Sequence, residues 1–224
     1  MTPKLRIACF AIACLLIAAG HPASAQQPDT VRVDLVRDDA PMLALLTAKD
    51  AGFYARENLD VLVTAKGRAQ EISGPQLRLW HVGLADVILS NRVAQDLRLI
   101  ALTSRRLTGV AASIILIEEK SDLLTRFLRA TIEGNVVALR DPARARTILA
   151  RDAGIKGARA IDASYRDFQA QSLLDMDISV ADVQRALKAS KIGLDADLYV
   201  DGSLMTELRK SGFFETLQKK YGAL

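Results

Sequence analysis

Short apolar, β-branched runs are spaced along the first half of the chain. They predict strands at residues 31–36, 59–67, 83–91, 98–106 and 111–119. Between them we predict helices at residues 41–58, at 68–82 (mainly after Pro75), and as a short turn at 92–97. Strands that alternate with helices are typical of a mostly parallel sheet, so we expect an α/β fold.

The alternation ends near residue 120, and the later apolar positions recur only at helical spacing. Helices are predicted at residues 121–133, 141–152, 179–190 and 203–220, with a looser stretch at 162–174. Asp141 before Pro142 is a favourable helix start, and so is Ser179 with Asp182 behind it. The segment SIILIEEKSDLLTRFLRA (113–130) holds the junction, where an apolar run predicted as strand passes within four residues into a helix.

The first 25 residues have the pattern of a secretory signal peptide. Lys4 and Arg6 precede the apolar stretch 7–20, and Ala23 and Ala25 form a signal-peptidase pattern. We therefore expect cleavage after Ala25 and a periplasmic location. A membrane anchor is the alternative, although a bilayer span needs ~20 apolar residues, more than this stretch provides.

Cleavage after Ala25 would change what chemistry the chain can support. The only cysteines, Cys9 and Cys14, would be lost, and His81 would be the only histidine left. This excludes a disulfide and a Cys/His zinc site. The net charge of +4 would fall to +2 with the loss of Lys4 and Arg6, so a nucleic-acid partner is not expected. The sequence has no Walker loop and no G-x-G-x-x-G motif, and we expect no cofactor.

Polar residues follow three of the predicted strands. In open α/β sheets, ligands bind beyond the carboxyl ends of parallel strands. Amides at the predicted helix start near Pro41–Met42 and the guanidinium of Arg105 suit an anion. Ordinary turn and capping chemistry is the alternative for all these positions. The predicted ligand-binding residues are Asp38, Asp39, Ser90, Asn91, Thr103, Ser104 and Arg105.

His81 is the one residue on which a Ser-His-Asp site would have to rely. It follows Trp80 and precedes an apolar run, where a packing or surface role is the simpler reading. No catalytic residue is therefore predicted, and we expect no enzyme.

The ordered segments resemble the periplasmic solute-binding proteins of ABC importers, in the branch for nitrate, sulfonates, taurine and thiamine-precursor pyrimidines. The resemblance covers most of residues 31–214, and no single motif is specific. It implies a type II periplasmic binding protein-like lobe, a small solute and a permease in the inner membrane. The segments are AKDAGFYARENLDVLV (48–63), GLADVILSN (83–91), FLRATIEG (127–134), DPARARTIL (141–149), ISVADVQRAL (178–187) and DLYVDGSLMTELRKSGF (197–213).

The chain departs from this family at the junction 113–130. In the family, the strand that resembles SIILIEE crosses into a second lobe, which is completed before the closing helices begin. Here FLRATIEG follows almost at once, so the resemblance implies that this chain lacks a second lobe of roughly a hundred residues. We expect three parts: the signal peptide (1–25), an α/β solute-binding lobe (26–119), and a helical C-terminal segment (120–224).

A single lobe should present an open shelf rather than an enclosed cleft. We expect weakened binding of a small anionic organic solute, about 4 kcal/mol or millimolar affinity. The alternative is an interaction module that dimerises, or binds a protein, through the exposed lobe face. An enzyme on the same scaffold is a third reading, because the thiamine-precursor branch includes synthases.

Overall fold

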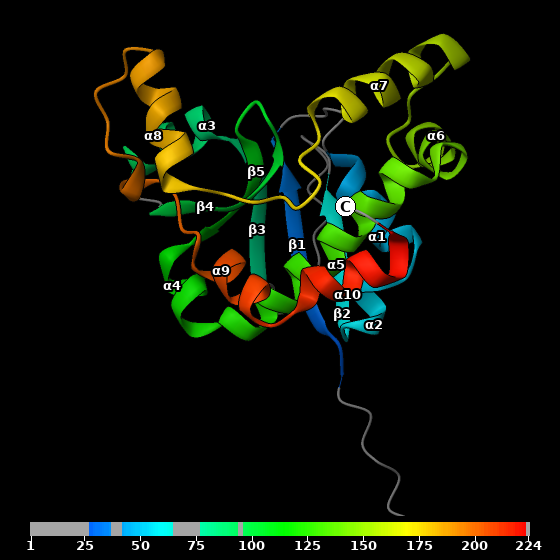
Figure 1. Cartoon of the computed structure of the whole chain (residues 1–224), viewed down its shortest axis with the longest axis horizontal. Helices are drawn as coiled ribbons and strands as arrows, with labels where there is room; N and C mark the ends of the chain where they lie inside the picture. Colours follow the sequence, from blue (N-terminus) through cyan, green and yellow to red (C-terminus); the bar gives the residue numbers. More distant parts are fainter. Residues whose placement is uncertain (1–26, 37–41, 65–76, 94–95, 223–224) are drawn as a thin grey trace, which may run out of the picture.

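The computed structural model describes residues 27–36, 42–64, 77–93 and 96–222 (Figure 1). The predicted signal peptide, Asp38, Asp39 and Pro41 lie outside the described residues. The strands are β1 (Asp29–Leu35), β2 (Leu59–Thr64), β3 (Leu77–Gly83), β4 (Leu97–Ser104) and β5 (Thr108–Ser113). The helices are α1 (Leu43–Asp50), α2 (Phe53–Arg56), α3 (Leu84–Asn91), α4 (Ile114–Glu119), α5 (Ser121–Arg140), α6 (Pro142–Arg151), α7 (Ala158–Gln171), α8 (Val180–Ala189), the short 3-10 helix η2 (Ala196–Leu198), α9 (Ser203–Lys210) and α10 (Phe213–Tyr221).

The five strands form one sheet in the order β2-β1-β3-β5-β4. β1 pairs in parallel with β2 and β3, whereas β5 is antiparallel to both of its neighbours, β3 and β4. Four strands therefore run in one direction and β5 runs against them. The predicted α/β class with a mostly parallel sheet is confirmed.

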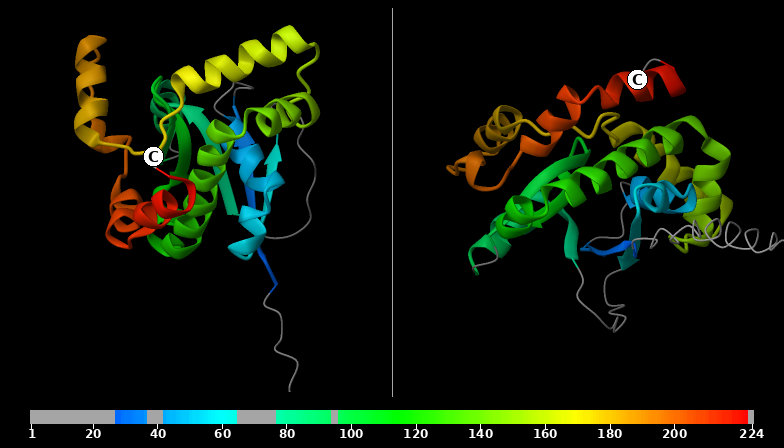
Figure 2. Two further views of the ribbon diagram at one scale, coloured as in Figure 1. Left: turned by 45° about the vertical axis from the view of Figure 1, so that its right-hand side comes forward. Right: turned by 90° about the horizontal axis from the view of Figure 1, so that it is seen from below.

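Helices α1 and α5 pack on each other on one side of the sheet, and α9 and α10 lie outside α5 (Figure 2). The contact between α1 and α5 is close because α5 has Gly134 there. A Cβ atom at Gly134 would lie 2.6 Å from the carbonyl oxygen of Ala44 and 2.6 Å from the amide nitrogen of Ala48. The predicted helix at 41–58 is confirmed, and it is broken at Gly52, which has a left-handed φ of 72°.

Two predicted elements on either side of Gly83 are wrong. The segment 77–83 is the central strand β3 rather than a helix, because pairing with β1 and β5 outweighs its local propensity. The segment 84–91, predicted as a strand, is helix α3. Its buried residues Leu84 and Val87 lie three positions apart, which is helical spacing.

The apolar run 113–119 is also not a strand. β5 ends at Ser113, whose Oγ accepts a hydrogen bond from the Leu116 amide at 3.3 Å and so caps α4. Ile115 is 65% exposed, whereas a core strand would bury it. A short apolar run fits a strand or a buried helix equally well, and here the capping serine favours the helix.

β4 and β5 are joined by a turn of three residues, Arg105-Arg106-Leu107, which makes the pair antiparallel. The Leu107 amide donates to the Ser104 carbonyl at 3.0 Å, and Leu107 has a left-handed φ of 57°. Gly109 allows the two strands to approach, since a Cβ there would lie 2.0 Å from the Ala101 carbonyl oxygen. The turn therefore stands at the carboxyl end of β4, beside the end of β3.

The outer edge of β4 is covered by two later segments of the chain. The Leu102 amide donates to the Met176 carbonyl, and the Leu99 amide donates to the Tyr199 carbonyl, both at 2.9 Å. The residues between these two attachments, including α8 and η2, form an excursion that leaves the edge of β4 and returns to it. α8 thereby stands away from the sheet on the side where the parallel strands end (Figure 1).

The described residues contain a single sheet, and all of its strands precede residue 114. Within those residues, no helix has both the length and the apolar character needed to cross a bilayer.

Candidate functional site

A pocket of about 450 Å³ lies at the carboxyl ends of β3 and β4. Four segments line it: the start of α3, the β4–β5 turn, the end of α7, and α8 together with Ser190 and Ile192, which follow α8 in the chain. The pocket is half open, and it has walls that the predicted open shelf would not have. Its lining residues are Gly83, Leu84, Ala85, Ile88, Arg106, Leu107, Thr108, Asp167, Gln171, Ala186, Leu187, Ser190 and Ile192.

The first turn of α3 brings backbone amides to the pocket. The Gly83 amide donates to the Asp86 carboxylate at 3.1 Å, and the Leu84 amide donates to the Leu107 carbonyl at 2.9 Å. The first bond caps the helix, and the second fixes its start against the β4–β5 turn. Ala85 is exposed in this turn, where helix amides have no intrahelical acceptor and the helix dipole favours negative charge.

Arg106 is the cationic side chain of the pocket. It is exposed, and its Nη2 lies 4.0 Å from Oδ1 of Asp167 on α7. An exposed ion pair at this distance contributes little to stability. The guanidinium is therefore available to an anion that enters the pocket.

Gln171 holds the end of α7 against the sheet. Its side chain is buried; Nε2 donates to the Asp167 carboxylate, and Oε1 accepts a hydrogen bond from Ser104 Oγ at 3.4 Å. The Arg105 amide donates to the Gln171 carbonyl at 2.9 Å. The position of Asp167 in the pocket thus depends on contacts with the end of β4.

α8 forms the apolar wall opposite α3. Leu187 is buried. Ile192, which follows α8 in the sequence, lines the same pocket as Ile88 of α3. Gln184 ties α8 to the following segment, because its Nε2 donates to the Leu194 carbonyl at 3.0 Å and its Oε1 accepts from the Ala196 amide at 2.8 Å. α8 and η2 therefore behave as one small unit beside the pocket.

Of the predicted ligand-binding residues that the structure describes, none lines this pocket. Ser90 and Asn91 end a helix rather than a strand, at the amino end of β4. The Asn91 side chain clamps Leu97, donating to its carbonyl at 2.9 Å and accepting from its amide at 2.7 Å. The Asn91 side chain is therefore used in a structural contact, which was the alternative to ligand binding for this residue.

Thr103 is fully buried beside His81. Its hydroxyl donates a hydrogen bond to the Thr108 carbonyl at 3.0 Å. The same hydroxyl lies 2.9 Å from His81 Nε2 and accepts a hydrogen bond from it, so Nε2 carries the proton of the neutral ring. Burial lowers the pKa of His81 to about 4, and the ring is neutral at pH 7. His81 lies within β3, where it has a packing role and no access to a substrate.

Ser104 is buried, and Arg105 is exposed but does not line the pocket. The pocket lies at the carboxyl ends of β3 and β4, but its lining there includes Gly83 and Arg106 rather than Ser104 or Arg105. Sequence reasoning missed the first turn of α3 because GLAD was read as strand. Asp167, Gln171 and Ile192 carry no local signal, because only the tertiary fold brings α7 and α8 to this place.

In the described part of the chain, no group of three or more His, Cys, Asp or Glu side chains is placed to hold a metal ion. No family model matches the sequence, and no curated protein matches it either.

Solved structures, however, share the fold. A ligand-binding component of an ABC-type import system from Staphylococcus aureus, solved with zinc bound, has a TM-score of 0.57 at 9% identity over 80% of this chain and 98% of that chain. A protein from Bordetella bronchiseptica RB50 has a TM-score of 0.60 at 10% identity, over 88% and 99%. The desulfurization enzyme DSZB has 0.58 at 9%, over 82% and 99%. These likenesses confirm the periplasmic-binding-protein-like fold class.

Proposed function

We propose that the chain is an exported solute-binding protein that takes a small anionic organic solute into the pocket between α3 and α8. The solute would be of the sulfonate, nitrate, taurine or pyrimidine-precursor class. An ABC permease in the inner membrane would receive it. Cleavage after Ala25 would release the protein into the periplasm. The fold shared with an import-system binding component supports this role.

The observation that carries the proposal is the division of the pocket into a polar end and an apolar wall. Arg106 and the exposed Ala85 in the first turn of α3 stand at the polar end, where the guanidinium and the helix dipole suit an anionic head group. Leu84, Ile88 and Leu187 offer apolar contacts to the rest of a small molecule. A concave site with a few polar anchors on an apolar surface is typical of solute pockets.

The opening of the pocket sets the expected affinity. Helices α7 and α8 add walls beyond the sheet, but the pocket stays partly open to solvent. A bound solute would keep part of its surface hydrated and gain less from burial than in an enclosed cleft. We therefore retain the expectation of millimolar binding, about 4 kcal/mol.

Thermal unfolding with a panel of sulfonates, nitrate, carboxylates and pyrimidines tests the proposal. A ligand that binds only the folded state raises the midpoint by mass action. At ten times a millimolar Kd the gain is about 1.4 kcal/mol, or roughly 3 to 6 °C for a chain of this size. A selective rise for one anionic class supports the proposal, and a cooperative melt that no solute shifts refutes it.

The second candidate, an interaction module that dimerises or binds a protein, is favoured by one observation. The large exposed apolar side chains of the described residues lie on α3 and the residues behind it, on α4, and on the α8–η2 segment, beside β4. They are Leu89, Val93, Ile115, Ile192 and Leu198. Light scattering of the solute-free protein separates the two functions, because a stable dimer that ignores every solute favours the module.

We propose no enzymatic activity. A hydrolytic site would need His81, which is fully buried and hydrogen-bonded to Thr103. One structural neighbour, DSZB, is an enzyme, but the shared fold carries no catalytic residue to this chain. Turnover that depends on His81 would overturn this reading.

A further inference from the structure

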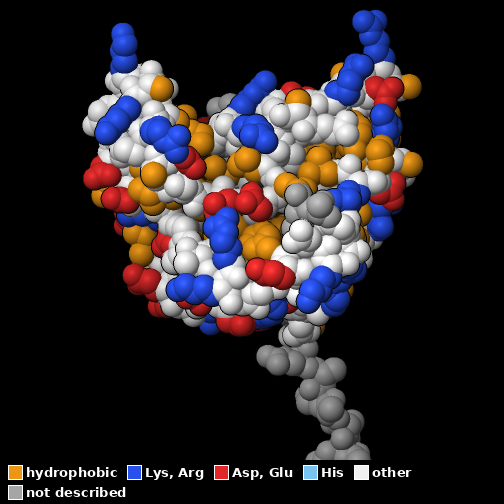
Figure 3. Space-filling view, in the orientation of Figure 1, with side chains coloured by type: hydrophobic (Ala, Val, Ile, Leu, Met, Phe, Trp, Pro, Cys, Tyr) orange, Lys and Arg blue, Asp and Glu red, His pale blue; other side chains and the backbone are white. Residues whose placement is uncertain are grey.

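Three segments that project on the same side of the molecule each carry a pair of cations. The start of α7 and the end of α8 project from the body on the same side, and the β4–β5 turn rises between them (Figure 1). Figure 3 shows Lys and Arg side chains at both projecting tips and between them. All six cations are exposed, and we call them the cationic rim: Lys156 and Arg159 before and in α7, Arg105 and Arg106 in the turn, and Lys188 and Lys191 at the end of α8.

The cations of the rim have almost no ion-pair partners among the residues that the structure describes. Within the described residues, Arg106 has only the 4.0 Å contact with Asp167, and the other five form no ion pair. Several arginines elsewhere are paired: Arg126 contacts Asp29 at 2.7 Å and Asp122 at 3.0 Å, and Arg144 contacts Asp50 at 2.7 Å. The positive charge of the rim is therefore left for a partner outside the chain.

An exposed aliphatic side chain accompanies the cations at the α8 tip. Ile192 follows Lys191 directly and is 40% exposed. Long cationic side chains next to an aliphatic one suit the boundary between lipid head groups and acyl chains, because the charge stays at the phosphates while the apolar part enters.

The distribution of the cations over three elements indicates which kind of partner can contact them all. A small anion would contact one pair, whereas the three pairs belong to three elements on one side of the molecule. An array of phosphate groups can contact all three pairs at once without a matched pattern of acidic side chains. We propose that the cationic rim docks the protein on an anionic phospholipid surface, with the pocket facing the membrane.

Flotation with vesicles tests this inference independently of any solute. The purified protein, with its N-terminus verified by mass spectrometry, is mixed with vesicles of phosphatidylcholine alone or in equal parts with phosphatidylglycerol. We expect flotation only with the anionic vesicles at low salt, and its loss at high salt. Each cation near such a surface contributes about fivefold to partitioning, so Lys188→Glu/Lys191→Glu should reduce it by at least about 25-fold.

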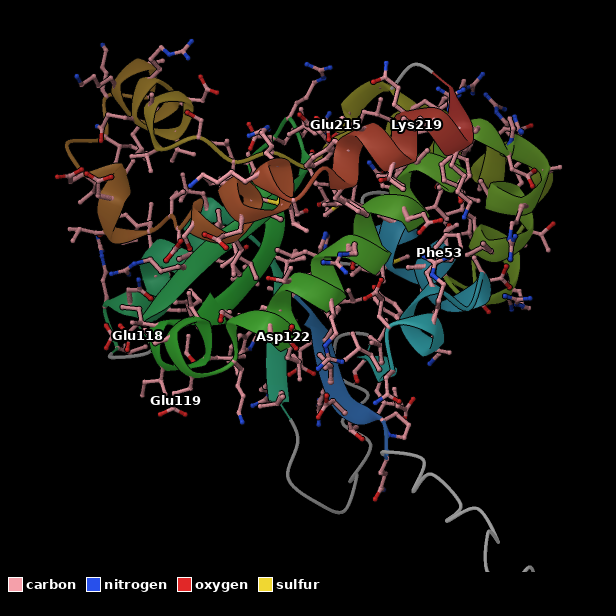
Figure 4. All side chains as sticks on the ribbon, turned by 60° about the horizontal axis from the view of Figure 1, so that its bottom comes forward. Phe53, Glu118, Glu119, Asp122, Glu215 and Lys219 are labelled. Carbon is pink, nitrogen blue, oxygen red and sulfur yellow. The ribbon has the colours of Figure 1, made fainter. Side chains whose placement is uncertain are left out.

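Lys120→Glu/Lys219→Glu is the matched control. It makes the same change in net charge, and both lysines are exposed and without ion pairs in the described structure. Lys120 lies between α4 and α5, and Lys219 lies on α10 (Figure 4), so both are outside the rim. The control should keep most of the flotation. Equal losses in the two variants would reduce the effect to net charge and overturn the proposal. Absence of flotation with anionic vesicles at low salt would also overturn it, and would leave an acidic protein as the partner for the rim.

Discussion

The guanidinium of Arg106 and the carboxylate of Asp167 face each other at 4.0 Å in the pocket. They come from the β4–β5 turn and from α7, which the fold brings together at the carboxyl end of β4. Because both side chains are solvent-exposed, their attraction adds little to folding. The pair instead sets the charge that an entering solute meets.

Asp167→Asn should separate stability from binding. We expect the free energy of unfolding to change by less than about 1 kcal/mol, because the ion pair is exposed. Asparagine keeps an acceptor for Gln171, and the loss of the carboxylate leaves Arg106 without a competitor. The midpoint rise caused by the best anionic solute should therefore increase. A smaller rise in Asp167→Asn, measured by the same thermal assay, would contradict this role.

His81 should make the protein sensitive to mild acid. Its pKa is lowered to about 4 in the folded state from a usual value of 6.5, because burial disfavours the charged ring. Between these pH values the unfolded chain binds more protons, so the free energy of unfolding falls as the pH decreases. The loss should reach roughly 3 kcal/mol by pH 4.

His81→Gln provides the comparison for this pH effect. Glutamine offers a donor for Thr103 but does not titrate in this range. Urea unfolding from pH 7.5 to pH 4 should give a shallower pH dependence for the variant, whatever its stability at pH 7.5. Parallel profiles for the two proteins would show that His81 does not gain its proton on unfolding.

Gly134→Ala should disrupt the contact between α1 and α5. The added methyl would lie 2.6 Å from backbone atoms of Ala44 and Ala48, which cannot move without shifting α1. We expect a loss of about 2 kcal/mol or more in the free energy of unfolding. Gly193→Ala is the control, because nothing lies within 4 Å of its Cβ position and its φ is not left-handed. Equal stability of both variants would mean that the two helices are not packed this closely.

Glu133 joins three helices and should control how firmly α10 is held. This buried carboxylate of α5 accepts hydrogen bonds from Arg56, from Lys220 at 2.7 Å and from Tyr221 at 2.6 Å. Burial alone would raise its pKa, but these three donors prevail and the pKa is lowered. Arg56 and Lys220 are half exposed, so we expect Glu133→Gln to cost about 2 kcal/mol, less than a fully buried pair.

Hydrogen exchange localises the effect of Glu133→Gln. Amides of α10 should lose protection more than those of the central strands, because Leu217 is the only buried residue of that helix. Asp182→Asn removes the exposed partner of Arg185 and should change stability by less than about 0.5 kcal/mol. Uniform loss of protection across the protein would argue against a local role for Glu133.

The sequence predicted those elements whose signals are local. Asp141 and Ser179 cap α6 and α8 as expected, and the strands β1, β2 and β4 lie where the apolar runs are. The sequence assigns 77–83 and 84–91 the wrong way round, because segments this short do not show by periodicity alone which of them will be paired on both edges as a strand. The three-residue turn after Ser104 was overlooked, and with it the antiparallel direction of β5.

The sequence places the candidate ligand-binding residues after strands, and the pocket lies at the carboxyl ends of β3 and β4 but is lined by other side chains. The rule that ligands lie beyond parallel strand ends is topological, so it points to an edge of the sheet and not to particular side chains. Thr103 and Ser104 have the expected positions, yet their hydroxyls are used inside the protein, by Thr108 and Gln171. Burial and hydrogen-bond partners cannot be read from residue type. Asp167 and Leu187 required the placement of α7 and α8, which no local pattern gives.

Anion binding at Arg106 is tested most directly by a matched pair of neighbours in the turn. Arg106→Gln removes the guanidinium that lines the pocket, and Arg105→Gln removes one that does not line it, with the same change in charge. Thermal midpoints would be measured with increasing concentrations of the solute that wild type selects. We predict that Arg105→Gln keeps the midpoint rise and that Arg106→Gln loses most of it. An equal rise in both variants, or a wild type that no solute stabilises, would contradict a solute site in this pocket.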